Sequence, residues 1–500
     1  MRVSRSILWN VCGTALPLAV GLAVIPTIVR RLGVERFGLL SVIWMLIGYF
    51  SLLDLGVSRT LTKVTADRIG SPAEKEIPSL LVTALGLVLA CSITVSLILA
   101  ACAHVLAQRV LHVSPQILED VSRAVVWLSL GLPFVMISTV LLGVLEGLQK
   151  FAATNLVRLP LGALMFLVPF GVVFFSNHLA PVAAMLSAVR VASVIALGVI
   201  AFRAVPGLRT EPARFGRDAV RHLLTFGGWL TLSNVVGPLL VYFDRFLIAA
   251  MRGSAAVAFY TVPYDALNRL LAFPTAIQGV LFPAFASLRV QEPSRVAAVF
   301  RKSSEKTALL MLPAMLGVML LARQGLQLWL GAQFARESAV VAEILMVGVF
   351  LNAMARAPFV MVQGYGYARW TALLHVLELP PYAVALYWLL RRYGIEGAAI
   401  AWTARIVVDT TALYLMAIRL ERALLGTALR DLSCVAVAYA AALGVDWADP
   451  ALPVRIAILA IITLCSASVL LRDVRGALIQ GSAAASAAPS VGLGGRLGGQ

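Results

Sequence analysis

The chain has 500 residues, of which 60% are hydrophobic and 13% are charged, and its mean hydropathy is +0.91. Soluble globular chains carry about 25% charged residues, so this composition excludes a soluble fold and indicates an all-α polytopic membrane protein. The formal net charge of +17 does not indicate nucleic-acid binding, because lysines and arginines cluster in the short gaps between apolar runs, where membrane topology favours them.

Apolar runs long enough to cross a bilayer recur along the whole chain. A membrane-spanning helix needs about 20 apolar residues, and we count about fourteen such runs, the first of which we interpret as an uncleaved helix. The gaps between them are too short to fold as soluble domains. We predict spans at residues 7–29, 37–58, 79–103, 122–145, 152–175, 180–202, 223–250, 257–287, 306–322, 339–362, 370–390, 395–418, 431–446 and 453–471.

The ends of the chain are predicted from charge and composition. With the N-terminus inside, about 24 lysines and arginines fall on the cytoplasmic side and about 11 on the other. This bias and the even number of spans predict that both termini are cytoplasmic. The final stretch, GSAAASAAPSVGLGGRLGGQ, is low in complexity and is expected to be disordered.

A weak internal repeat relates the two halves of the chain. The stretch VLEGLQKFAATNLVRLPLGALMFLVP resembles MVQGYGYARWTALLHVLELPPYAVAL, so that Thr154 aligns with Thr371. Gly33 and Gly253 also follow the first helix of each half at similar spacing. Two related halves around a central axis are a recurrent plan of membrane transporters.

Charged residues inside the predicted spans are candidates for function. Each costs roughly 2.5–3.5 kcal/mol at the bilayer centre, so we expect these side chains to face the protein interior. The arginines are Arg158, Arg190, Arg245, Arg269, Arg356 and Arg405. The acids are Asp54, Asp244, Asp265, Glu343, Glu378 and Asp409.

Three of the arginines have a local alternative to cargo binding. Asp265 and Arg269 lie four residues apart on one helix face, and the same spacing joins Arg405 to Asp409, so both pairs can form ion pairs, and cargo binding stays open beside this. Arg245 lies near the end of a span, where its long side chain can reach the membrane interface.

Arg158, Arg190 and Arg356 have no acid three or four residues away. Each therefore needs an anion from another helix or from a ligand. The guanidinium fork matches the oxygens of a phosphate group. We therefore place all six arginines among the candidate substrate-binding residues, with these three as the strongest.

Asp54 lies in the segment LLDLG near the end of the second span. Two interpretations stay open: a structural carboxylate paired with Arg158 or Arg190, or an acid that gates the transport path or couples it to an ion. The second interpretation also applies to Asp244, Asp265 and Asp409.

The aromatic residues carry a weaker signal. Several tryptophans lie towards the ends of spans, which is typical of an aromatic belt at the membrane interface. They are Trp9, Trp44, Trp229, Trp329 and Trp447. Sugar stacking is a second interpretation for Tyr260, Tyr264, Tyr365 and Tyr367.

Motifs of enzymes and metal sites do not occur in the sequence. It contains no GxxxxGK[ST] phosphate loop, no HExxH and no histidine–cysteine cluster with metal-ligand spacing. We therefore expect no catalysis, no cofactor and no metal.

Two regions resemble a known family. The segment RRLGVERFGLLSVIWMLIGYFSLLDLGVSRTLTK combines a Leu-Gly, an aromatic-Gly turn at Phe37-Gly38 and an apolar helix that ends in Asp54-Leu55-Gly56. Together with VYFDRFLIAAMRGSAAVAFYTVPYDAL and the later FPAFASL, it is similar to the Wzx-type oligosaccharide flippases of the polysaccharide transporter family.

This resemblance implies the fold of the multidrug, oligosaccharidyl-lipid and polysaccharide exporter superfamily. That fold has two pseudo-symmetric six-helix bundles, here followed by two C-terminal helices. The expected boundaries are an N-terminal bundle at 1–205, a C-terminal bundle at 206–422, two additional helices at 423–476 and a disordered tail at 477–500.

The resemblance also implies a function. A flippase of this family moves a polyprenyl-pyrophosphate-linked oligosaccharide from the inner to the outer leaflet of the bacterial cytoplasmic membrane by alternating access, for O-antigen or exopolysaccharide synthesis. Its partners would be this cargo and membrane lipids, but not nucleic acid, and a polysaccharide polymerase complex stays open as a further partner. The alternatives are a lipid II-type or drug exporter of the superfamily, an integral-membrane glycan-modifying enzyme and an inert membrane anchor.

Overall fold

The computed structural model describes most of the protein as helix. Eight of the described helices are long and apolar enough to cross a membrane. The predicted spans 223–250 and 257–287 lie partly outside the described residues, so the count of about fourteen spans stays a prediction. The described residues are 17, 19–50, 56–208, 215–216, 220, 242–272, 274–275, 281, 285, 287–289, 291–447 and 450–486.

The N-terminal helices are close to the predicted spans. Residues 19–32 are helical, and Gly33, with φ of +80°, separates them from the next helix. Phe37 and Gly38, which we expected in a turn, instead lie inside that helix. The following elements are α2 (Val34–Phe50), α3 (Val57–Arg68), η1 (Pro72–Glu76), α4 (Ile77–Ala101), α5 (Ala103–Val105), η2 (Leu106–Val110), α6 (Leu118–Gly147), α7 (Phe151–Val172) and α8 (Leu179–Ala204).

One N-terminal segment differs from its prediction. We expected residues 59–78 to form a loop, but α3 and η1 occupy most of it. The helix α3 forms because Val57, Leu61 and Val64 recur at helical spacing and form a buried face, while polar residues cover the other side.

In the second half, residues 242–252 are helical and Gly253, with φ of +82°, ends that helix. The elements that follow are α10 (Ser254–Asn268), η3 (Arg269–Leu271), α12 (Pro293–Leu330), α13 (Ala332–Gly364), α14 (Ala368–Leu420), η4 (Arg422–Leu424), α15 (Leu425–Trp447) and α16 (Leu452–Ser486).

Two of these helices are longer than the spans predicted for them. We predicted a span at 306–322, but α12 begins earlier, because Val296 and Phe300 continue its buried face into the charged segment before the span. The last helix, α16, runs past residue 477, where we expected a disordered tail to begin. Residues 487–500 lie outside the described residues.

The element α14 consists of two helices joined at Gly394, whose φ is +63°. Asp409 lies 3.5 Å from His375, measured from Oδ1 to Nε2. In one straight helix these residues would lie about 50 Å apart, so the chain must fold back at Gly394. The two halves match the separate spans predicted at 370–390 and 395–418.

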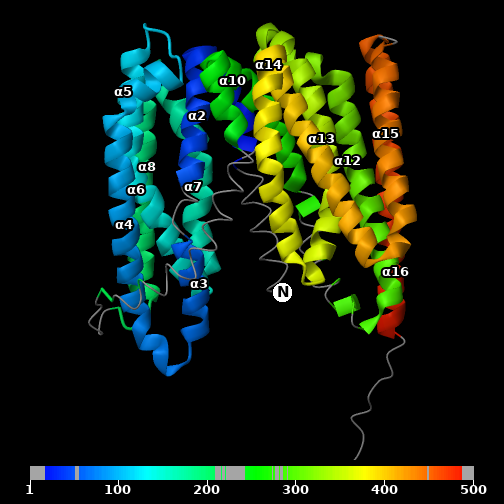
Figure 1. Ribbon diagram of the computed structural model, residues 1–500, viewed down its shortest axis with the longest axis horizontal. Coiled ribbons are helices and arrows are strands. Elements are labelled where there is room, and N and C mark those ends of the chain that lie inside the picture. Colours follow the sequence, from blue (N-terminus) through cyan, green and yellow to red (C-terminus); the bar gives the residue numbers. More distant parts are fainter. Residues whose placement is uncertain are drawn as a thin grey trace, which may run out of the picture.

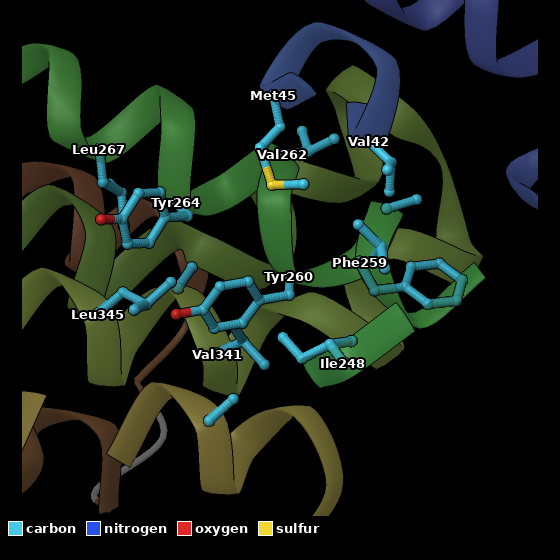
Figure 2. Close-up of a cluster of buried hydrophobic side chains, with 14 of the residues drawn as sticks. Val42, Met45, Ile248, Phe259, Tyr260, Val262, Tyr264, Leu267, Val341 and Leu345 are labelled. Carbon is cyan, nitrogen blue, oxygen red and sulfur yellow. The ribbon is translucent and has the colours of Figure 1, made fainter. Parts of the chain in front are cut away.

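The helices form two groups (Figure 1). The helices α2–α8 lie in one group and α12–α16 in the other, and α10 packs against α2. A Cβ atom on Gly38 of α2 would lie 1.8 Å from the Ser254 carbonyl oxygen, so only glycine allows this contact. Figure 2 shows Phe259 and Tyr260 of α10 close to Val42 of α2 and Val341 of α13.

The internal repeat has a matching backbone in its two copies. The helix α6 ends at Gly147 and α13 ends at Gly364. In the helices that follow, the Thr154 hydroxyl donates to the Phe151 carbonyl, and the aligned Thr371 hydroxyl donates to the Ala368 carbonyl. The same residues therefore terminate and restart a helix in both halves.

Candidate functional site

A cavity of about 570 Å³ lies between the two groups of helices. Residues 21–25, α2 and α7 form one wall, and this wall is uncharged. The opposite wall is formed by the helix at 242–252, α10, η3, α12, α13 and α14. It carries every charged residue that lines the cavity in the described part of the chain. These residues are Arg245, Arg269, Arg356, Arg405 and Asp265.

Arg245 is held in place by an ion pair. Its Nη2 lies 2.5 Å from Asp265 Oδ1, and its side chain is 5% exposed while that of Asp265 is 45% exposed. The guanidinium carbon also lies 5.3 Å from the ring centre of Tyr242 and 5.1 Å from that of Tyr264. Asp265 and two aromatic faces therefore compensate much of the charge of Arg245.

Arg269, Arg356 and Arg405 line the same cavity and form no ion pair with the described residues. The Arg269 guanidinium lies 5.7 Å from the ring centre of Phe166. The Nε atoms of Arg356 and Arg405 are buried and have no hydrogen-bond acceptor among the described residues. Because a partly buried cation is stabilised by an opposite charge, these three groups give the cavity a strong preference for an anion.

The predicted local ion pairs are replaced by contacts between helices. Local pairing was one of two interpretations for Asp265 and Arg269, but Asp265 pairs with Arg245. It was also one of two for Asp409 and Arg405, but Asp409 Oδ1 lies 3.5 Å from His375 Nε2 and forms no ion pair with Arg405. The backbone fold-back at Gly394 brings His375 to Asp409, and a rule based on sequence spacing cannot detect it.

Two of the three arginines that we considered strongest lie outside this lining. Arg158 Nη1 lies 2.5 Å from Glu146 Oε1 of α6, and its side chain is 49% exposed. Arg190 Nη2 lies 3.4 Å from the sulfur of Met165, which itself lines the cavity. Arg190 is therefore behind the uncharged wall, and Arg356 is the one of the three that faces the cavity.

The predicted gating acids occupy different environments. Asp54 lies outside the described residues. Asp244 is fully buried, and its carboxylate accepts hydrogen bonds from the Tyr260 hydroxyl at 2.6 Å and from the Arg245 backbone N–H at 2.7 Å. This network ties Asp244 to the core, whereas Asp265 lines the cavity.

Asp409 and Glu378 are a pair of buried acids on the two halves of α14, and neither lines the cavity. They are 7% and 5% exposed. Both oxygens of Glu378 lack a donor among the described residues. A buried carboxylate without a donor is costly as an anion, so Glu378 needs a proton or a cation.

Aromatic side chains of the cavity were only partly anticipated. We assigned Trp44 and Trp329 to an aromatic belt, but both line the cavity. Trp44 is fixed by a hydrogen bond from its Nε1 to the Met165 carbonyl at 3.1 Å. Of the tyrosines considered for sugar stacking, Tyr264 lines the cavity and Tyr260 is buried against Asp244. Among the described residues, no group of histidine, cysteine and acidic side chains could hold a metal ion.

Comparison with known proteins found one family model and related sequences. A family model described as "Polysaccharide biosynthesis protein" matches residues 3–289. The "Putative O-antigen transporter" of Shigella flexneri is 28% identical over 417 residues, which cover 83% of this chain and 97% of that protein. The "Lipopolysaccharide biosynthesis protein WzxC" of Escherichia coli (strain K12) is 26% identical over 145 residues, which cover 29% of this chain and 28% of that protein.

Two solved structures show the fold. The lipid II flippase MurJ in an inward closed conformation superposes with a TM-score of 0.69 at 12% identity, over 94% of this chain and 99% of that chain. An inward-facing multidrug resistance MATE family transporter superposes with a TM-score of 0.68 at 15% identity, over 83% of this chain and 98% of that chain. Both are named as transporters or flippases and neither as an enzyme.

Proposed function

Since the chain belongs to the polysaccharide biosynthesis protein family, we propose that it is a flippase for a polyprenyl-pyrophosphate-linked oligosaccharide. The observation that carries this proposal is the cavity between the two groups of helices, lined by four arginines and one aspartate. The similarity to an O-antigen transporter over 83% of the chain supports the class of cargo. A drug or cation exporter would instead favour acidic groups in its cavity.

Moving a charged and polar cargo across the hydrocarbon of a membrane requires a cationic cavity. A pyrophosphate and a polar sugar chain lose their hydration in hydrocarbon, at a cost of many kcal/mol, and cannot cross alone. Arg269, Arg356 and Arg405 can replace this hydration with charge-assisted hydrogen bonds, for which guanidinium groups are well suited. Trp44 lines the cavity and provides an aromatic surface for sugar rings, and the polyprenyl tail stays in the bilayer.

The proposed topology rests on the charge bias along the chain. In our proposal both termini are cytoplasmic, and the cavity opens alternately to the inner and the outer leaflet. Moving negative charge outward gains about 2.3 kcal/mol per charge for each 100 mV of inside-negative potential. A polysaccharide polymerase complex would then use the lipid-linked product at the outer leaflet.

We place ion coupling in the pair of buried acids, Glu378 and Asp409. Both acids are buried, and Glu378 lacks a hydrogen-bond donor among the described residues. In our proposal these acids hold a proton, and an anionic cargo bound to Arg356 and Arg405 would change how tightly they hold it. Asp409→Asn or Glu378→Gln should therefore remove the dependence of transport on the proton gradient, while Asp67→Asn, in the exposed part of α3, should not.

The proposed function is tested by deleting the gene and analysing the lipids of the two leaflets separately. We expect polyprenyl-linked oligosaccharide to accumulate in the inner leaflet and surface polysaccharide to be lost. Complementation with the wild-type chain should restore both. Normal flipping in a deletion strain that has no second transporter would refute the proposal. A glycan-modifying enzyme would instead yield a changed glycan when the purified protein is assayed in detergent.

A further inference from the structure

A second basic cavity lies away from the central one. It has a volume of about 470 Å³ and is formed by α12, α13 and α16. None of its lining residues also lines the central cavity. In Figure 1, α12, α13 and α16 lie in the group of helices that does not contain α2. The cavity is therefore separate from the proposed transport path.

The lining of this cavity carries more positive than negative charge. Its charged residues are Arg323 of α12, Arg336 and Glu343 of α13, and Arg455 of α16. Arg323 and Arg336 are exposed and form no ion pair or side-chain hydrogen bond with the described residues. Two guanidinium groups are therefore available at the cavity mouth for an external anion.

The third arginine forms the fixed part of the site. Arg455 is 7% exposed, and its guanidinium donates to the Pro450 carbonyl at 3.1 Å and to the Leu320 carbonyl at 3.0 Å. The bond to Leu320 ties the start of α16 to the last third of α12. Arg455 therefore has a fixed position in the lining of the cavity.

The site lies towards one end of three long apolar helices. Arg336 and Arg455 lie near the starts of their helices, and Arg323 lies about 10 Å before the end of α12, at the same end of the bundle. The outer surface of α16 beside them is apolar, with Val454 and Ile456 about half exposed. A ligand held here would have its charged group in the cavity and apolar chains along α16.

We propose that this cavity binds the phosphate group of an anionic membrane phospholipid. Basic pockets between membrane helices are known to take such headgroups, and guanidinium groups suit phosphate oxygens. A bound lipid would link α16 to α12 and α13. This site does not depend on the cargo, so the inference stands whether or not the proposed function is correct.

The test measures thermal unfolding of the full-length protein in a neutral detergent. Phosphatidylglycerol, phosphatidylcholine or inorganic phosphate is titrated in separate experiments. We expect phosphatidylglycerol to raise the unfolding temperature at lower concentration than phosphatidylcholine. In the variant R323Q/R336Q, the phosphatidylglycerol concentration for half of the effect should rise about 25-fold, since each arginine at a lipid surface contributes about fivefold.

The matched control is R295Q/R301Q, which removes two exposed charges from the opposite end of the same helix, α12. It should respond to phosphatidylglycerol like the wild type. Arg336→Gln alone, with an expected fivefold change, provides a second measurement if the double variant unfolds. Equal stabilisation by both lipids, stabilisation by inorganic phosphate alone, or an unchanged response of R323Q/R336Q would each overturn the proposal.

Discussion

The two walls of the central cavity differ in charge although they come from the two halves of a repeat. In the described residues, the N-terminal wall contributes Trp44, Met165 and Phe166 but no charged side chain, whereas the C-terminal wall contributes four arginines and Asp265. In our proposal, the charged wall binds the anionic group of the cargo and the uncharged wall contacts its uncharged parts.

The two copies of the repeat also differ in their side-chain contacts. Glu146 of the first copy aligns with Gln363 of the second, and Arg158 aligns with His375. In the first copy Glu146 and Arg158 form an ion pair. In the second copy His375 instead contacts Asp409. The helix ends are therefore common to the two copies, while their side chains have different partners.

The largest expected effect is on transport. The variant R356Q/R405Q should reduce export by about 100-fold or more, because two charge-assisted hydrogen bonds to the cargo contribute about 1.5–3 kcal/mol each. Export is measured as surface polysaccharide in a deletion strain that carries the variant. The control Arg158→Gln removes an arginine paired with Glu146 outside the cavity lining and should export like the wild type. Equal loss in both variants would show that the two walls do not differ as we describe.

A second large effect is expected where the two halves meet. Gly38→Ala should lower the free energy of unfolding by about 3 kcal/mol or more, because the new Cβ would lie 1.8 Å from a backbone oxygen of α10. The folded fraction in detergent, measured by size-exclusion chromatography, should fall accordingly. Gly171→Ala is the matched control, since a Cβ there meets no atom within 4 Å. A stable Gly38→Ala variant would contradict the close packing of α2 on α10.

A smaller effect is expected for the ion pair of the charged wall. Asp265→Asn leaves Arg245, whose side chain is 5% exposed, without its carboxylate. Because Asp265 is 45% exposed, the cost should lie below that of a fully buried pair, at about 1–3 kcal/mol. Thermal unfolding measures it. Glu292→Gln, which breaks an exposed ion pair with Arg295, should change stability by less than about 0.5 kcal/mol.

The smallest effect is expected on the uncharged wall. Trp44→Phe keeps an aromatic face but removes the hydrogen bond to the Met165 carbonyl. A bond of this kind contributes about 0.5–1.5 kcal/mol, so export should fall only a few-fold. If Trp44→Phe reduced export as much as R356Q/R405Q does, the uncharged wall would contribute as much to cargo binding as the charged wall, and our account would be contradicted.

The sequence predicts the membrane class and most of the helices, because long apolar runs and their breaks are local features. Contacts between helices are not local, and this explains the errors at the site. Arg158 has no acid within a helical turn, yet Glu146 of the preceding helix reaches it. Asp265 lies within one helical turn of Arg269, yet it forms its ion pair with Arg245 of another helix. The free-energy cost of inserting a charged side chain into the membrane indicated which residues face the protein interior. It could not indicate their partners, because these depend on the tertiary fold.

The most direct test of the central claim compares two lipids in vesicles that contain the purified protein. One lipid carries its sugar through a polyprenyl pyrophosphate, and the other carries the same sugar on an uncharged polyprenyl link. We predict that the wild type flips the pyrophosphate-linked lipid at least about tenfold faster, and that R356Q/R405Q loses most of this preference. Equal rates for the two lipids, or an unchanged preference in the variant, would contradict recognition of an anionic cargo by these arginines.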